Sequence, residues 1–124
     1  MKIKCIKIYD NQGKEQTSSS WLTIGKIYVP LEILCDVRNG ISYRLVGDAK
    51  DKSPGVFKAM QFEVISNKKS SNWDVNIGED GFIVIGPKSW RITSFWEHCY
   101  DGDPSALEIY KREARIIMEE ENAL

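Results

Sequence analysis

The chain has 124 residues, of which 42% are hydrophobic and 28% are charged. This length suits one domain, and these proportions argue against an intrinsically disordered chain. The three cysteines Cys5, Cys35 and Cys99 are widely spaced and odd in number, so they predict free thiols rather than a disulfide framework. Lysines interrupt the first ten residues, which argues against a signal peptide, and we expect a cytoplasmic protein.

Charge is distributed unevenly along the chain, although the net charge is only −1. Residues 1–72 carry 12 basic and 7 acidic side chains, whereas residues 73–124 carry 5 and 11. A split of this kind favours either an acidic face suited to a basic partner or two halves that attract each other. Both interpretations stay open at the level of the sequence.

Residues 2–9 predict a strand whose apolar positions change phase. Ile3 and Cys5 alternate with lysines, and beyond Ile6 the alternation shifts by one residue. A one-residue shift predicts a β-bulge or a strand that is buried on both faces. The segment 11–20 that follows is polar and rich in turn-forming residues, so we expect an exposed loop there.

Residues 27–34 and 41–46 alternate between apolar and polar side chains and predict two more strands. Pro30 has no N–H to donate to a strand ladder, so we expect it at a sheet edge or a bulge. Asn39 and Gly40 stand between the two strands, and this pair is typical of a tight hairpin turn. The sequence therefore predicts a hairpin across residues 27–46.

Further strands are expected after a charged loop and one short turn. The last two of these strands are separated by a Gly-Glu-Asp-Gly segment, which predicts a second hairpin. We expect the charged loop at residues 47–55, the short turn at residues 57–60, and the strands at residues 62–65, 73–77 and 82–85.

Two helices are predicted at the end of the chain. Pro87 is expected to open a short helix in which Ile92, Phe95 and Trp96 share a face. Asp103 and Pro104 form a typical helix start, because Asp accepts from an orphan N–H and Pro fits the first turn. Leu107, Tyr110, Ala114 and Ile117 then recur at steps of three and four and predict one buried stripe.

The order of these elements predicts an α+β fold in a single domain, residues 1–124. About six short strands would form a curled antiparallel sheet or a small SH3-like barrel over residues 1–86. The helical part, residues 87–121, would cap it.

We expect no enzyme activity, because no nucleophile lies in a recognisable setting and no phosphate-binding, dinucleotide-binding or zinc-protease motif occurs. His98, the only histidine, lies beside acidic residues and is the one candidate for a base or metal ligand. A partly exposed His at a helix end, beside a solvated acidic turn, is the favoured interpretation. No cofactor and no metal are therefore predicted.

Acidic and aromatic residues in the second half are the candidates for binding a partner. Tryptophan is over-represented at interface hot spots, and carboxylates fit a basic surface. The candidates are Glu79, Asp80, Trp96, Glu97, Asp101, Asp103, Glu119 and Glu120, with Glu121 beside them. Solvated surface acids and a core tryptophan are the alternative interpretation.

Three blocks of the sequence, taken together, resemble bacterial immunity proteins of polymorphic-toxin and contact-dependent growth inhibition systems, of an SH3-like, β-rich kind. The resemblance covers roughly residues 20–115. The blocks are Gly25–Ile33, then Tyr43–Asp48 with Pro54–Phe57 and Gln61–Ile65, and finally Trp90–Ala106 with its Phe-Trp-Glu and Asp-Gly-Asp-Pro segments.

This resemblance implies a toxin inhibitor that binds a cognate toxin domain in the cytoplasm and occludes its active site. Such toxin domains are often nucleases, and acidic residues can occupy a cleft that is built for phosphates. Three alternatives remain: an SH3-like nucleic-acid-binding module that uses the lysine-rich half, an adaptor or structural subunit that uses exposed aromatics, and a small hydrolase built on His98. We expect neither a membrane nor nucleic acid as the partner.

Overall fold

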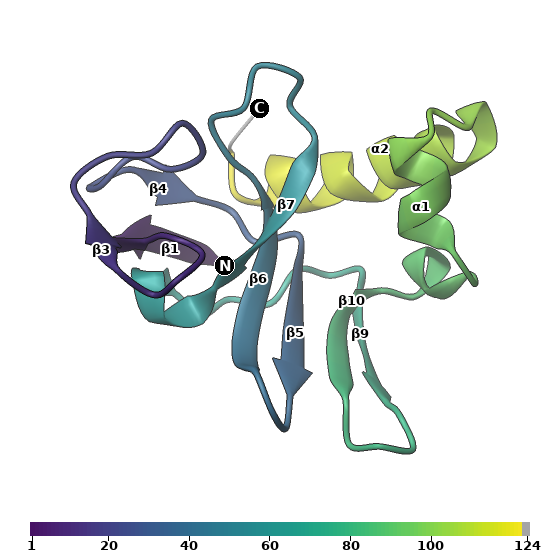
Figure 1. Cartoon of the computed structure of the whole chain (residues 1–124). Coiled ribbons are helices and arrows are strands. Elements are labelled where there is room, and N and C mark those ends of the chain that lie inside the picture. The colour runs from purple at the N-terminus through teal and green to yellow at the C-terminus, as the bar shows by residue number, and fades with distance from the viewer. Residues whose placement is uncertain (123–124) are drawn as a thin grey trace.

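A computed structural model describes residues 1–122 and has an α+β fold. Short antiparallel strands come first and two helices come last (Figure 1). The strands are β1 (Lys2–Cys5), β2 (Ile8–Tyr9), β3 (Glu15–Gln16), β4 (Ile27–Tyr28), β5 (Glu32–Asp36), β6 (Gly40–Val46), β7 (Pro54–Lys58), β8 (Phe62–Ser66), β9 (Trp73–Ile77) and β10 (Ile83–Pro87). The helices are α1 (Phe95–Tyr100) and α2 (Pro104–Glu120), and short 3-10 turns occupy Ala59–Gln61 and Lys88–Arg91.

The largest sheet has five strands in the order β7-β6-β5-β10-β9. Both predicted hairpins are confirmed, because β5 pairs with β6 and β9 pairs with β10, each antiparallel. The first turn occupies residues 37–39 instead of Asn39 and Gly40 alone. Gly40 begins β6 opposite Asp36 with a φ of 77°, a backbone conformation that glycine adopts without strain. The two hairpins extend side by side, away from the rest of the chain (Figure 1).

The N-terminal strands form a three-stranded sheet, β4-β1-β8, and a separate β2–β3 pair. The phase shift in residues 2–9 marks a break between β1 and β2, where the N–H groups of Ile6 and Lys7 both donate to the carbonyl of Gln61, at 2.8 and 3.2 Å. The expected strand 27–34 is likewise divided at Pro30, so that β4 and β5 belong to different sheets.

Two apolar clusters hold the molecule together, one on each face of the five-stranded sheet. The first joins this sheet to the N-terminal strands through Ile3, Tyr28, Tyr43, Leu45 and Phe62. The second packs the helices on the opposite face through Leu31, Trp90, Phe95, Ala106 and Ile117. The helical part therefore caps the strands, as the sequence predicts.

Several expectations about the strands were incomplete. The structure has ten strands rather than about six, and the sheets stay open, with no barrel among residues 1–122. Some of the additional strands are two-residue pairs that are too short to leave an alternation in the sequence. The strand β7 was missed because Pro54 and Gly55 are typical turn residues, yet they pair with Val46 and Leu45.

The helical part differs from expectation at its start. Pro87 ends β10 instead of opening a helix, and Ser94 interrupts the helical path with a left-handed φ of 61°. Ile92 is consequently exposed instead of sharing a buried face with Phe95. In α2 the expected cap is confirmed, because Asp103 accepts from the Ala106 N–H at 3.0 Å, but Ala106 is the buried residue in place of Leu107.

Candidate partner-binding surfaces

An open cleft lies between the N-terminal loops and the β7 edge of the large sheet. Its volume is about 930 Å³. Its walls combine aromatic and aliphatic side chains with a few polar ones, a composition that suits an apolar segment of a partner. The lining comes from residues 8–13, 19–22 and 55–61 and includes Tyr9, Asp10, Trp21, Val56, Phe57 and Met60.

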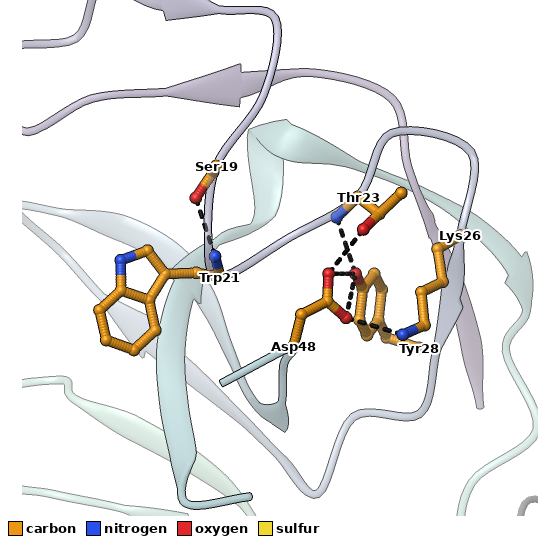
Figure 2. A network of polar contacts seen from close by, with 6 residues as sticks. All are labelled: Ser19, Trp21, Thr23, Lys26, Tyr28 and Asp48. Atoms are coloured by element: carbon orange, nitrogen blue, oxygen red, sulfur yellow. Dashed lines mark hydrogen bonds and ion pairs between the residues drawn. The ribbon is translucent and has the colours of Figure 1, made fainter. Parts of the chain in front are cut away.

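Asp48 fixes the loop that forms one wall of this cleft (Figure 2). Its carboxylate accepts from the Thr23 hydroxyl at 2.6 Å, from the Lys26 ammonium at 2.7 Å and from the Tyr28 hydroxyl at 3.1 Å. Burial by itself raises the pKa of Asp48, but the hydrogen bonds from Lys26, Thr23 and Tyr28 outweigh it and lower that pKa. The carboxylate therefore stays charged and binds the loop at neutral pH.

The backbone of Trp21 is held on both sides. Its N–H donates to the Ser19 hydroxyl at 3.0 Å, and its carbonyl accepts from the Asp48 N–H at 2.8 Å. Gly47 permits this close approach, because a Cβ there would lie 2.5 Å from the Trp21 carbonyl oxygen. The position of Trp21 is thus set by the corner between β6 and β7.

The indole of Trp21 points away from this polar network (Figure 2), and 57% of the residue is exposed. A large aromatic side chain on a fixed backbone loses little conformational freedom when a partner covers it. Tryptophan is also the residue most enriched among interface hot spots. This arrangement gives Trp21 the properties of a preorganised anchor for a protein partner.

The structure brings only part of the predicted acidic set together. Glu97, Asp101 and Asp103 are all exposed and lie within one helical turn and the following connection between α1 and α2. We name these three residues the acidic turn. Asp103 also caps α2, so its carboxylate stabilises the helix as well as adding charge.

The other predicted acids lie elsewhere. Glu79 and Asp80 occupy the tip of the β9–β10 hairpin, which Figure 1 places at a different end of the molecule from the acidic turn. The carboxylate of Glu120 accepts from the N–H of Ser71 at 2.9 Å, and that of Glu121 pairs with the N-terminal ammonium. Glu119 is exposed beside them, so the run 119–121 is partly structural instead of a frayed end.

Trp96 is a packing residue in this structure. The guanidinium of Arg44 lies 3.9 Å from the centre of its ring, and Trp90 and Tyr110 pack against it edge-on. Arg44 also donates to the buried carboxylate of Glu32 at 2.7 Å. Trp96 therefore fastens α1 to the sheet and is half-buried, in contrast to Trp21.

In the lysine-rich half, two of the lysines face carboxylates. Lys26 is neutralised by Asp48, and Lys4 lies opposite Glu63 in the sheet. His98 is exposed at the end of α1, and across residues 1–122 no three His, Cys, Asp or Glu side chains gather as a metal site. No helix in the described part of the chain has the length and hydropathy needed to cross a membrane.

Sequence reasoning missed the cleft and its tryptophan. The cleft is lined by residues from the segments 8–22 and 55–61, and no local sequence pattern in either segment predicts that they lie next to each other. One signal was present, because Trp21 follows three serines directly, and a large aromatic inside a polar loop is unusual for a core residue. Comparisons with protein family models, with curated proteins and with solved structures found no match for this chain.

Proposed function

We propose that this chain is an immunity protein that binds a cognate toxin domain in the cytoplasm and neutralises it by occluding the active site. The observation that carries the proposal is Trp21, exposed beside a cleft of mixed polar and apolar lining while its backbone is fixed by Ser19 and Asp48. Such a preorganised aromatic favours a protein partner. That the partner is a toxin rests on the resemblance of residues 20–115 to immunity proteins.

The acidic turn supplies the contact expected for a nuclease. Glu97 and Asp101 present negative charge at the surface, and a substrate cleft built for phosphates attracts such charge and is blocked by it. Trp21 would then supply affinity, and the acidic turn would supply attraction and exclusion of the substrate.

An adaptor that binds another protein through the same cleft is the second candidate, because Trp21 and Met60 would serve it equally. An adaptor would leave its partner's activity unchanged, whereas an immunity protein abolishes it. A nucleic-acid-binding module is less well supported, since Asp48 and Glu63 interrupt the basic residues.

The test is a pull-down of the tagged protein from its native cells after nuclease treatment. We expect a toxin domain at near-equal stoichiometry, and we expect that domain to stop growth when it is expressed without this protein. Recovery of a partner that is harmless to cells would favour the adaptor. Recovery of no protein, together with salt-sensitive RNA or DNA binding in the untreated sample, would contradict the proposal.

Two matched variants test the role of Trp21 in that complex. Trp21→Ala removes the exposed indole and should reduce recovery of the toxin domain at least tenfold, as for a hot-spot residue. Val37→Ala removes an exposed apolar side chain from the turn between β5 and β6, away from both the cleft and the acidic turn, and should leave recovery unchanged. Equal recovery with both variants would remove the cleft from the proposed interface.

A further inference from the structure

One face of the five-stranded sheet carries an apolar row that the rest of the chain leaves open. This row crosses the neighbouring strands β9, β10, β5 and β6, each of which contributes one residue directly opposite the next, so the four side chains share a face. The residues are Ile77, Ile83, Cys35 and Ile41. Ile77 is 69% exposed and Val75, two residues back on the same strand, is 55% exposed. The open row therefore runs to the outer strand, β9.

The N-terminal strands cover only the other end of this face. Ile33, Tyr43 and Phe57 form the next row and pack into the first apolar cluster. The row from Ile77 to Ile41 lies one step further along the two hairpins, which Figure 1 shows extending beyond the N-terminal strands. The apolar surface is thus continuous with the core.

The strand β9 is an unprotected edge. Within residues 1–122 it pairs with β10 alone, its register has no bulge, and it contains neither lysine nor proline. Natural edge strands usually carry such features, because they prevent pairing with another chain. The opposite edge, β7, has them: it begins at Pro54, whose carbonyl accepts from the Tyr100 hydroxyl, and it ends at Lys58.

The sequence of β9 is complementary to itself in the antiparallel direction. With Val75 opposite Val75 of a second copy, Trp73 comes opposite Ile77, and Asp74 comes opposite Asn76. All five residues are then opposed and each apolar side chain meets an apolar one. Asp74, whose carboxylate already pairs with Arg91 at 2.8 Å, faces an amide rather than a second carboxylate. A register centred on Asp74 would oppose two carboxylates instead.

The strand β8, one of the two edges of the three-stranded sheet, lacks this property. Self-pairing of β8 about Val64 would oppose Phe62 to Ser66 and Glu63 to Ile65. Apolar side chains would face polar or charged ones, so this edge offers no comparable match. The edge strand β9 therefore has a self-complementarity that β8, of the same length, does not have.

We propose that two copies of this chain associate through β9, antiparallel about Val75, to form one continuous sheet across a two-fold axis. Ile77 of each copy would lie opposite Trp73 of the other, whose indole packs into the core of its own chain, so the apolar row of each copy would continue to the core of its partner. The interaction is isologous and closes on itself, as in most homodimers. It leaves Trp21 and the acidic turn outside the contact.

Light scattering after size exclusion, on the full chain at rising concentration, measures this association. The wild-type protein should reach twice the 14.2 kDa chain mass. Val75→Lys would place two ammonium groups opposite each other at the axis and should weaken dimerisation roughly tenfold or more. Val64→Lys makes the same substitution at a similarly exposed position on β8 and should leave the dimer intact.

Cysteine cross-linking tests the register. The background carries Cys35→Ser and Cys99→Ser. In it, Val75→Cys should form an interchain disulfide on mild oxidation, because the Cβ atoms of directly opposed residues are close enough for a small backbone shift to allow the bond. Ile77→Cys should not, since the two copies of residue 77 would lie about 13 Å apart along the strands. Circular dichroism confirms that each variant is folded.

A wild-type protein that stays monomeric at about 100 μM, well above the Kd of a weak but specific dimer, would overturn the proposal. A dimer that Val75→Lys leaves unchanged, or equal cross-linking at positions 75 and 77, would overturn it as well. Protection of β9 only when a different protein is bound, without self-association, would assign this edge to that partner and contradict a dimer.

Discussion

Asp48 illustrates how one carboxylate can organise a binding surface. It joins Thr23, Lys26 and Tyr28 around one point, and its own N–H holds the carbonyl of Trp21. Each hydrogen bond to a charged group contributes more than a neutral one, and the three act on a single loop. The exposure of Trp21 therefore depends on a residue 27 positions further along the chain.

Asp48→Asn should destabilise the protein by about 1 to 2 kcal/mol at pH 7, since the hydrogen bonds from Thr23 and Tyr28 lose their charged acceptor in addition to the ion pair with Lys26. The folded-state pKa of Asp48 is lowered from its ordinary value of 3.8. Its stabilising contribution is thus complete above about pH 4 and is lost as the pH falls through the folded-state pKa. Urea unfolding of both proteins at pH 7 and pH 2.5 measures this, and an equal difference in unfolding free energy at both pH values would contradict it.

At the scale of the elements, α1 is held on the sheet by the buried pair of Arg44 and Glu32. Glu32 is only 3% exposed, and burial raises its pKa more than Arg44 lowers it. The guanidinium also stacks on Trp96 and donates to the Tyr100 hydroxyl at 3.3 Å. One arginine thus connects β5, β6 and α1.

Arg44→Leu should destabilise the fold by about 3 to 5 kcal/mol, because it leaves a buried carboxylate without its partner. Lys26→Leu is the matched control, since it breaks an ion pair of the same 2.7 Å length whose lysine is half exposed. That loss should cost no more than about 1 kcal/mol. Thermal or urea unfolding ranks the two variants, and the reverse order would show that burial does not govern these pairs.

Replacing Ser94 with glycine should stabilise the protein. Ser94 adopts a left-handed φ of 61° and its side chain makes no capping hydrogen bond, so Ser94→Gly relieves strain without losing a contact. We expect a gain of about 0.5 to 1 kcal/mol. Gly102 has a φ of 82° with open space around it, so Gly102→Ser introduces only backbone strain and should lower the free energy of unfolding by a similar amount. The melting temperatures of the two variants measure the gain and the loss. A destabilising Ser94→Gly would contradict this interpretation.

The elements that could be predicted from the sequence are those with local signals. The two hairpins were predicted from Asn39-Gly40 and from the segment Gly78–Gly81. The start of α2 was predicted from Asp103-Pro104. The strand β7 could not be predicted, because its pairing with β6 overrides the turn preference of Pro54 and Gly55.

The candidate site was less predictable than the fold. Burial of Trp96 and exposure of Trp21 both depend on contacts between distant segments, which no local pattern records. The carboxylates of Asp103, Glu120 and Glu121 likewise bind to the chain itself, so their charge does not serve a partner alone. Charge reversal to test the acidic turn should therefore change Glu97 and Asp101 and leave Asp103 in place.

At the scale of the whole molecule, apolar packing and the pairing of β5 with β10 join the two halves, and most of the ion pairs lie within one half. The ion pairs Lys26–Asp48 and Arg44–Glu32 lie within residues 1–72, and Arg91–Asp74 lies within residues 73–122. The pair between the N-terminal ammonium and Glu121 links the two parts. The charge asymmetry of the sequence therefore stays available at the surface, where an acidic turn can meet a basic partner.

The most direct measurement titrates the recovered toxin domain with this protein and follows the catalytic activity of the domain. We predict complete inhibition at one-to-one stoichiometry for the wild type and a requirement for at least tenfold more of the Trp21→Ala variant. The Glu97→Lys, Asp101→Lys double variant should associate more slowly and lose its sensitivity to salt. Full inhibition by Trp21→Ala at the wild-type ratio, or a partner whose activity continues in the complex, would contradict inhibition through this surface.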